Sequence, residues 1–159
     1  MVFTGIYEHT VDTKNRMAIP SDVRRQLKAD ADKTGSEQWL FVTLDASKQS
    51  LSVWPDATFS QRAAQLEQSQ RAASQTIAYE RVFFSLSHRV EMDKQGRIRL
   101  PDRLLQMSKL GTDVTVVGVN DHLEIWDRSN WEAFLDKQLE NCPELLMHPR
   151  QAMKPEDQA

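Results

Sequence analysis

The sequence predicts an α+β fold, rich in β-strands, that is built from a tandem duplication. The motif D-x-x-[N/G]-R-h-x-h-P, in which h is an apolar residue, occurs at residues 12–20 (DTKNRMAIP) and again at residues 93–101 (DKQGRIRLP). Short alternating or apolar segments flank each motif, and a helix-like stretch follows each one. The matched segments come in the same order in both halves, which favours duplication over a chance match.

Each copy is expected to begin with a strand that leads into a tight turn. Apolar residues alternate at residues 9–11 and 87–92, immediately before the motif. Asn and Gly tolerate the positive φ that hairpin turns demand, and Asp can accept hydrogen bonds from the turn backbone. Residues 16–19 and 97–100 alternate again, so the motif predicts a hairpin of two short strands.

After the motif proline, each copy predicts a short helix, a second hairpin and a further helix. Ser21 and Asp102 are candidate N-caps for the short helices. The strands of the second hairpins are expected at residues 39–44, 50–54, 114–119 and 122–126. The first copy is the longer one, and its extra residues are expected in the polar stretch 29–38. In the second copy residues 127–129 (DRS) are expected to cap the last helix and Pro143 to end it.

The middle and the end of the chain set the predicted domain boundaries. Good helix formers from residue 57 predict a helix that runs to about residue 78 or breaks near Ser74. Residues 79–85 are too apolar for a free linker and are interpreted as a packed strand or the end of a helix. The predicted domains are a first repeat with an insertion and a helix (1–79), a second repeat with a C-terminal helix (80–142) and a flexible tail (143–159).

The composition is that of an ordinary globular protein and argues against several classes of protein. Lys and Arg total 20 against 23 Asp and Glu, so the formal net charge of −3 excludes a uniformly basic nucleic-acid binder but permits basic residues grouped on one face. Cys142 is the only cysteine, which excludes a disulfide within the chain and a Cys-rich zinc site. No apolar run is long enough to span a bilayer, and we expect no secretory signal.

Neither a metal site nor a catalytic motif is indicated by the residue pattern. The four histidines lack the spacing of metal ligands, and they are His9, His88, His122 and His148. No nucleophile elbow, dinucleotide-binding glycine motif or P-loop occurs. We therefore expect no enzyme activity, no cofactor and no small-molecule substrate.

The two motifs are similar to those of a known family. Together with residues 1–5 (MVFTG) and 9–16 (HTVDTKNR), they resemble MraZ, a bacterial family encoded at the head of the division and cell-wall gene cluster. The resemblance covers residues 1 to about 142. Each half also resembles the AbrB and SpoVT type of DNA-binding domain, in which two copies interlock. The resemblance therefore implies a tandem-duplicated, AbrB-like swapped-hairpin barrel with flanking helices, whose chains assemble into rings.

The same resemblance implies a cytoplasmic, nucleoid-associated transcriptional regulator. Its partners would be double-stranded promoter DNA, at G-rich direct repeats before its own gene cluster, and further copies of the chain in a homo-oligomeric ring. No membrane partner is expected. The alternative function is a protein-interaction scaffold, or an antitoxin-like AbrB-type domain that does not bind DNA.

The candidate DNA-binding residues belong to the two motifs and to the basic pair that follows the first proline. They are Lys14, Asn15, Arg16, Arg24, Arg25, Lys94 and Arg97, while Asp12, Asp93 and Gly96 are interpreted as structural residues of the turns. Arginine can bridge guanine O6 and N7 or hold a phosphate, and a β-hairpin is narrow enough for the major groove. Alternatively, the motif Asp and Arg pair across their own turn and serve only its shape.

This chain departs from the family pattern in ways that bear on binding. Asn15 stands where the family more typically has a turn glycine. Leu104 and Leu105 stand in place of Arg24 and Arg25, so the second copy is expected to contribute less to nucleic-acid binding or to bind differently. Residues 9–25 and residues 88–105 each carry a net charge of only +2, which offers few phosphate contacts, so oligomerisation is part of the hypothesis.

Overall fold

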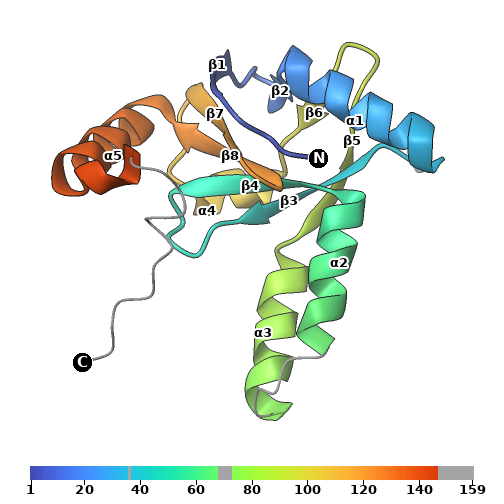
Figure 1. Ribbon diagram of the computed structural model, residues 1–159. Helices are drawn as coiled ribbons and strands as arrows, with labels where there is room; N and C mark the ends of the chain where they lie inside the picture. The colour runs from blue at the N-terminus through green and yellow to red at the C-terminus, as the bar shows by residue number, and fades with distance from the viewer. Residues whose placement is uncertain (36, 68–72, 147–159) are drawn as a thin grey trace.

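A computed structural model describes residues 1–35, 37–67 and 73–146 (Figure 1). Its larger sheet has six antiparallel strands in the order β1-β7-β8-β4-β3-β5, and a second sheet consists of β2 and β6. The strands are β1 (Ile6–Thr10), β2 (Arg16–Ala18), β3 (Trp39–Leu44), β4 (Ser50–Pro55), β5 (His88–Glu91), β6 (Arg97–Arg99), β7 (Asp113–Val119) and β8 (His122–Asp127). The predicted α+β class, rich in strands, is confirmed.

The two copies of the duplicated unit exchange strands. β1 of the first copy pairs with β7 of the second, and β5 of the second pairs with β3 of the first, so Tyr7 lies opposite Val116 and Leu40 opposite Val90. At the centre, β4 pairs with β8, and in the small sheet β2 pairs with β6. The strand order therefore reads the same from either edge when equivalent strands are interchanged. This confirms a duplicated unit whose copies are swapped.

The motif does not form the self-contained hairpin that the sequence predicts. The Asp12 N–H donates to the Arg16 carbonyl at 3.0 Å, and beyond that bond β1 enters the large sheet while β2 enters the small one. Asp93 and Arg97 close the second turn in the same way at 2.8 Å. Each flanking strand takes its partner from the other copy, because the exchange buries the apolar faces of two small units in one core.

The strand alternation in β2 and β6 determines which side of the small sheet faces solvent. Met17 and Ile98 point into the core, with 1% and 0% of their surface exposed. Burying such a side chain contributes about 1.5–3 kcal/mol. Successive side chains of a strand point to opposite faces, so the arginines that flank these two residues lie on the outer face.

Helices α1 (Ser21–Thr34) and α4 (Asp102–Met107) follow the two motif prolines. The extra residues of the first copy lengthen α1, which ends at Gly35 in the left-handed conformation, with φ of 65°. The insertion expected at residues 29–38 is thus largely helical.

The predicted N-caps of α1 and α4 are wrong. Pro20 and Pro101 occupy the N-cap positions, and no side-chain hydrogen bond caps either helix. Ser21 and Asp102 are instead the first helical residues. Proline fits the cap position because its fixed φ of about −65° suits the extended residue that enters a helix.

Helix α5 (Arg128–Asn141) begins and ends as the sequence predicts. The Asp127 carboxylate accepts hydrogen bonds from the N–H groups of Ser129 at 3.2 Å and Asn130 at 3.3 Å. The helix ends before Pro143, where the short 3-10 helix η1 (Pro143–Leu146) follows. No helix of the described part of the chain is long and apolar enough to cross a membrane.

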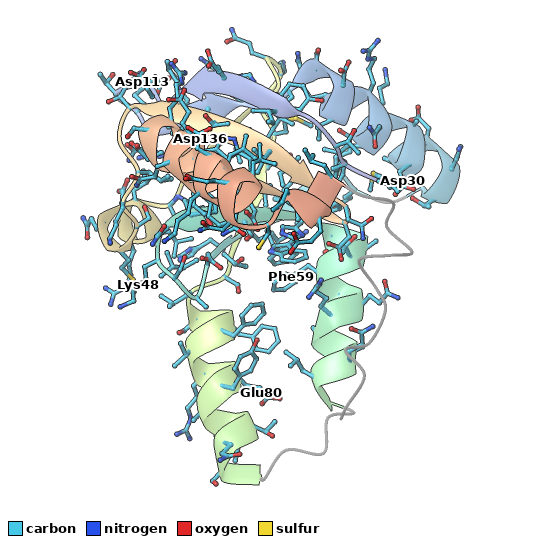
Figure 2. The ribbon with its side chains drawn as sticks, turned by 60° about the vertical axis from the view of Figure 1, so that its left-hand side comes forward. Asp30, Lys48, Phe59, Glu80, Asp113 and Asp136 are labelled. Atoms are coloured by element: carbon cyan, nitrogen blue, oxygen red, sulfur yellow. The ribbon has the colours of Figure 1, made fainter. Side chains whose placement is uncertain are left out.

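Two helices, α2 (Asp56–Glu67) and α3 (Ala73–Ser85), form an arm that extends away from the sheets (Figures 1 and 2). Of the two predictions for residues 57–78, a helix to about residue 78 or a helix that breaks near Ser74, the structure has two separate helices; residues 68–72, between them, lie outside the described chain, and Ser74 is the second residue of α3. Residues 79–85 belong to α3, as one of the two predictions for them had it. At the base of the arm Phe59 stacks on Phe41 of β3, with ring centroids 4.0 Å apart.

The domain boundaries stay predictions. The division expected between residues 79 and 80 falls inside α3. The tail expected at residues 143–159 begins with η1, and its residues 147–159 lie outside the part of the chain that the structure describes.

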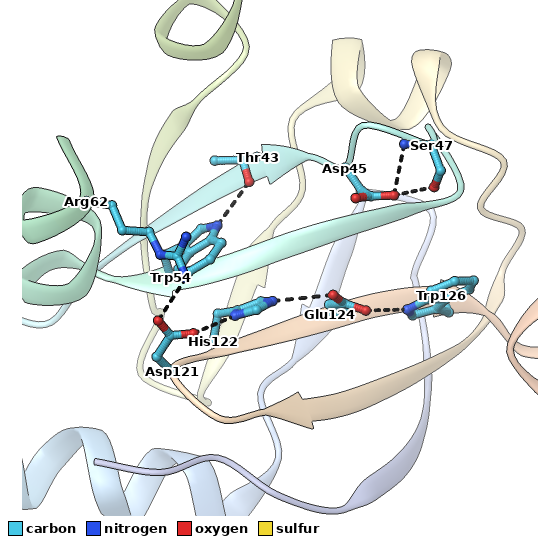
Figure 3. Close-up of polar contacts among 9 residues, drawn as sticks. All are labelled: Thr43, Asp45, Ser47, Trp54, Arg62, Asp121, His122, Glu124 and Trp126. Atoms are coloured by element: carbon cyan, nitrogen blue, oxygen red, sulfur yellow. Dashed lines mark hydrogen bonds and ion pairs between the residues drawn. The ribbon is translucent and has the colours of Figure 1, made fainter. Parts of the chain in front are cut away.

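A chain of polar contacts ties the arm to β8 (Figure 3). Arg62 of α2 pairs with Asp121 at 3.1 Å, and Asp121 in turn contacts Nδ1 of His122 at 2.8 Å. The other ring nitrogen of His122 lies 3.3 Å from Glu124, which accepts a hydrogen bond from the Trp126 indole at 2.8 Å. Both ring nitrogens can donate only when the imidazole is protonated, so this arrangement favours a charged His122.

The environment of His122 sets its pKa. Burial of the ring lowers the pKa of His122, but the hydrogen bonds and charges of Glu124 and Asp121 outweigh it, and the net result is a raised pKa. The ring also stacks on Trp54, with centroids 4.0 Å apart. In the first copy the equivalent strand position is Ser50, so the first copy has no counterpart of His122 and of the contacts it makes.

Candidate nucleic-acid interface

The two motif turns have the same backbone geometry. The N–H of Asn15 donates to the Asp12 carbonyl at 3.0 Å, and the N–H of Gly96 donates to the Asp93 carbonyl at 3.0 Å. Asn15 and Gly96 have positive φ angles of 60° and 77°. Each turn is therefore a three-residue loop that closes on a left-handed residue, as the Asp-x-x-Asn/Gly step predicts.

The Asp12 carboxylate organises the first turn. One carboxylate oxygen accepts from the backbone N–H groups of Lys14 and Arg16, each at 2.9 Å, and the other accepts from Arg16 Nε at 2.8 Å. The backbone N–H of Arg16 is the main cause of a lowered pKa of Asp12; desolvation opposes it, and the Arg16 guanidinium and the Lys14 N–H add to the lowering. The pairing of Asp12 with Arg16 that the sequence left open is therefore present.

The second turn repeats this pattern. Asp93 accepts from the N–H groups of Gln95 and Arg97, and from Arg97 Nε, at 2.9 Å each. The pKa of Asp93 is lowered for the same reasons as that of Asp12, the Arg97 N–H first. The arginine side chains keep 33% (Arg16) and 28% (Arg97) of their surface exposed. Within the described residues no other hydrogen bond reaches either guanidinium, so its two Nη groups remain available to a ligand.

Backbone bonds between the copies hold the two turns beside each other. The N–H of Ile19 donates to the Gly96 carbonyl at 2.9 Å, and the N–H of Leu100 donates to the Asn15 carbonyl at 2.7 Å. The Asn15 side-chain amide also donates to Asp102 at the start of α4. Each turn is thus fixed by the copy to which it does not belong, and the two motif arginines lie on one rigid surface.

We call the antiparallel pair β2 and β6, with its two turns, the ribbon. On its outer face Arg16 lies opposite Arg99, and Ala18 lies opposite Arg97. Arg99 is exposed and was missing from the residues predicted to bind DNA. The signal was available, because the alternation that buries Ile98 places both of its neighbours on the outer face.

Lys14 and Lys94 are exposed at the tips of the turns, as predicted for phosphate contacts. Arg25 is also exposed, with 79% of its side chain accessible, and pairs with Asp22 on its own helix. These positions suit a solvated surface as well as a nucleic-acid contact. The structure therefore brings Lys14 and Lys94 to the ribbon and leaves Arg25 on an outer turn of α1.

Arg24 behaves differently from its neighbour. It is half-buried over the second turn, where its Nη1 lies 3.4 Å from the Gln95 carbonyl. A Cβ atom on Gly96 would come within 2.3 Å of the same Nη1. Arg24 of the first copy thus packs on the turn of the second copy, and it is not half of a uniform basic pair with Arg25.

The match between Leu104-Leu105 and the basic pair needs a correction of one residue. Val23 and Leu104 are both buried, at 1% and 0% exposure, and occupy the same place in their helices. Arg24 therefore corresponds to Leu105, and Arg25 to the next residue along α4. The contact that Arg24 makes with the second turn consequently has no charged counterpart at the first turn.

A groove of about 520 Å³ lies beside the second turn. Its charged lining consists of Arg24, Lys28, Lys94, Glu37, Glu91 and Asp93. The three acidic residues offset the three basic ones, so the positive charge of this region is concentrated on the ribbon. Among the described residues no group of three or more His, Cys, Asp or Glu side chains could hold a metal ion.

The fold and the ribbon define a class of protein: two swapped copies of one α+β unit in a single chain, each presenting an arginine that its own turn carboxylate orients. A family model described as "MraZ protein, putative antitoxin-like" matches residues 2–81 and 83–145. A curated relative, the transcriptional regulator MraZ of Finegoldia magna, is 32% identical over 133 residues, which cover 84% of this chain and 86% of that protein. The chain belongs to the MraZ family.

Family membership confirms the resemblance drawn from the two motifs. It supports a role in transcription regulation and not an enzymatic one. It does not say which residues contact a partner, and that step depends on the ribbon.

Proposed function

We propose that this chain regulates transcription by binding duplex DNA with the ribbon. The observation that supports the proposal is that Arg16 and Arg97, each held by its turn carboxylate, lie on one outward face. A two-stranded ribbon fits a major groove about 12 Å wide. The guanidinium Nη groups would bridge guanine O6 and N7 or hold a phosphate, while Lys14 and Lys94 would contact phosphates.

Pairing with the turn carboxylate is compatible with DNA binding by the same arginine. Asp12 binds only the Nε side of Arg16, which fixes the side chain and leaves its outer edge free. An oriented guanidinium loses less conformational freedom when it binds than a mobile one. The pairing across the turn therefore supports the binding role.

Self-assembly is the second part of the proposal. One ribbon makes only a few charged contacts, and several ribbons on one duplex gain avidity from effective concentration. The chain exposes apolar side chains on two separate helices: Ile77, Val82 and Phe84 on α3, and Phe134 and Leu139 on α5. Two different surfaces in contact form a head-to-tail interface, which closes into a ring when the rotation permits. Direct repeats in the promoter of its own gene cluster, bound on the nucleoid, are the target that fits such a ring.

The test is duplex binding across a salt series. Arg16→Ala is expected to weaken binding to promoter DNA by about 1–3 kcal/mol per site. Arg81→Ala removes the same charge from the exposed surface of α3 and serves as the matched control, with the assembly state of both variants checked by light scattering. Equal binding by wild type and Arg16→Ala would contradict the proposed role of the ribbon.

The alternative function is a protein-interaction scaffold without DNA binding. The family description "antitoxin-like", the acidic net charge of −3 and the apolar surface of the arm favour it. A DNA-binding ribbon gives an affinity that falls steeply with salt, because bound counterions are released. A salt slope near zero for wild type would favour the scaffold.

A further inference from the structure

The outer face of the ribbon is not symmetric, although the two copies that form it are equivalent. Under the duplication, Arg16 corresponds to Arg97, and Ala18 corresponds to Arg99. In the observed register Arg16 lies opposite Arg99, while Arg97 lies opposite Ala18. One end of the ribbon therefore carries two facing arginines and the other end carries one.

Two like charges directly opposite each other destabilise an antiparallel pair of strands. Arg99 is exposed, and within the described residues no ion pair or hydrogen bond of its side chain is found. Asp12 pairs with the Nε edge of Arg16 and offsets one of the two positive charges, while the backbone of its own turn also engages it. A net charge of +1 and the unbonded Nη groups of Arg16 therefore remain beside Arg99 on the outer face, which an anion would stabilise.

We propose that Arg16 and Arg99 together hold one backbone phosphate of the duplex, and that this clamp exists only at the first-turn end of the ribbon. The inference rests on the proposed DNA-binding function and assigns unequal roles within it. Two guanidinium groups supply more than enough N–H donors for the two non-bridging oxygens of one phosphodiester. At the other end Arg97 faces Ala18, so it has no second guanidinium with which to share a phosphate.

The salt dependence of binding tests the clamp. Each phosphate contact contributes about one unit to the slope of log K against log salt concentration. Arg99→Ala is expected to weaken binding to all duplexes alike, by several-fold, and to reduce the slope by less than one unit, because Arg16 still contacts the shared phosphate. The double variant Arg16→Ala/Arg99→Ala loses that phosphate and is expected to reduce the slope by about one unit. Arg99→Lys keeps the charge and is expected to keep the slope. Ala18→Arg supplies the missing arginine opposite Arg97 and is expected to strengthen binding to all duplexes alike.

A double-mutant cycle locates the contact. If Arg16 and Arg99 share one phosphate, the effects of Arg99→Ala and Arg16→Ala on binding are not additive, whereas the effects of Arg99→Ala and Arg97→Ala are additive. Position 99 is exposed, so Arg99→Ala is expected to fold normally, and thermal unfolding and light scattering verify this for every variant.

The outcomes separate the two proposals. A wild-type protein that binds no duplex DNA overturns the proposed function and the clamp together. A wild-type protein that binds and is weakened by Arg16→Ala, while Arg99→Ala leaves affinity and slope unchanged, overturns the clamp alone. Equal effects of Arg99→Ala in both single-variant backgrounds also overturn it, because the phosphate is then not shared with Arg16.

Discussion

The first turn, residues 12–16, and the second turn, residues 93–97, differ in what packs on them and not in how they are built. Both close with the same backbone bonds and the same carboxylate-to-arginine contact. The second turn has a glycine at its left-handed position and Arg24 packed over it. The first has an asparagine there, which donates to Asp102.

This difference shows that the two copies of a duplication can keep the same fold while their surfaces diverge. The Asp and the Arg that define each turn are the same in both copies, because each turn makes backbone hydrogen bonds that hold the other copy. The residues around the turn have diverged, and with them the charge on the ribbon. The predictions below test whether the copies are equal in the core and unequal at the surface.

The largest effect is expected in the core and should be the same for both copies. Met17 and Ile98 are equivalent residues of β2 and β6, and both are buried. Met17→Ala and Ile98→Ala are each expected to lower the free energy of unfolding by about 2–5 kcal/mol, because each leaves a cavity. Urea denaturation measures the loss. A cost below 1 kcal/mol in only one copy would show that the core is less symmetric than the strand pairing indicates.

A smaller and unequal effect is expected at the left-handed turn positions. Gly96→Ala places a Cβ atom 2.3 Å from Arg24 Nη1 and puts alanine at a φ of 77°, so it should cost about 1–2 kcal/mol. Asn15→Gly keeps a residue suited to positive φ and loses only an exposed hydrogen bond, so a change within about 0.5 kcal/mol is expected.

Adding Arg24→Ala to Gly96→Ala separates the two causes in the second turn. If the clash with Arg24 matters, the double variant recovers part of the loss; if only the φ angle matters, it recovers nothing. Thermal unfolding of wild type, Gly96→Ala, Arg24→Ala and the double variant distinguishes these two outcomes. A larger cost for Asn15→Gly than for Gly96→Ala would reverse the comparison.

The residues within each turn were sufficient to predict the turns, but they could not predict which strands pair across the chain. Asp, Asn and Gly specify the turn within five residues, and alternation assigns β2 and β6 their buried faces. The exchange of strands between the copies was predicted only from the resemblance to AbrB-type domains, because the same residues could equally form a local hairpin. The contact of Arg24 with Gln95 joins positions 71 residues apart, which no local pattern indicates.

The arm shows a second limit of prediction from sequence. Good helix formers occur throughout residues 57–78, so helix propensity alone does not divide the arm into the two helices α2 and α3. Arg99 is the opposite case, since the pattern contained the information. Arg99 occupies a variable position of the motif, so the motif itself does not mark it, and only its register opposite Arg16 gives it a role.

The polar chain at His122 distinguishes the second copy from the first at neutral pH. The pKa of His122 is raised, so its contribution to stability is complete below the unfolded value of about 6.5 and is lost as the pH rises through the higher folded value. His122→Gln is expected to cost about 1 kcal/mol in acid, and less as the pH increases.

Unfolding of wild type and His122→Gln between about pH 5.5 and pH 9 measures this difference. Ser50→Ala changes the equivalent strand position of the first copy and serves as the control, with no pH-dependent difference expected. A gap between wild type and His122→Gln that grows with pH would mean that His122 is neutral in the folded protein.

The smallest effect is expected from the turn carboxylates in acid, and it should be equal in the two copies. The pKa values of Asp12 and Asp93 are both lowered, first by the backbone N–H of the motif arginine. Their contribution is therefore present above the unfolded pKa of about 4 and is lost as the pH falls through the folded value. Asp12→Asn and Asp93→Asn should each remove the same part of the acid-dependent loss of stability, as followed by urea midpoints at decreasing pH. Since the Arg24 contact reaches the Gln95 carbonyl and not the carboxylate, a markedly stronger acid dependence from Asp93 than from Asp12 would show that the divergent surroundings alter the turns themselves.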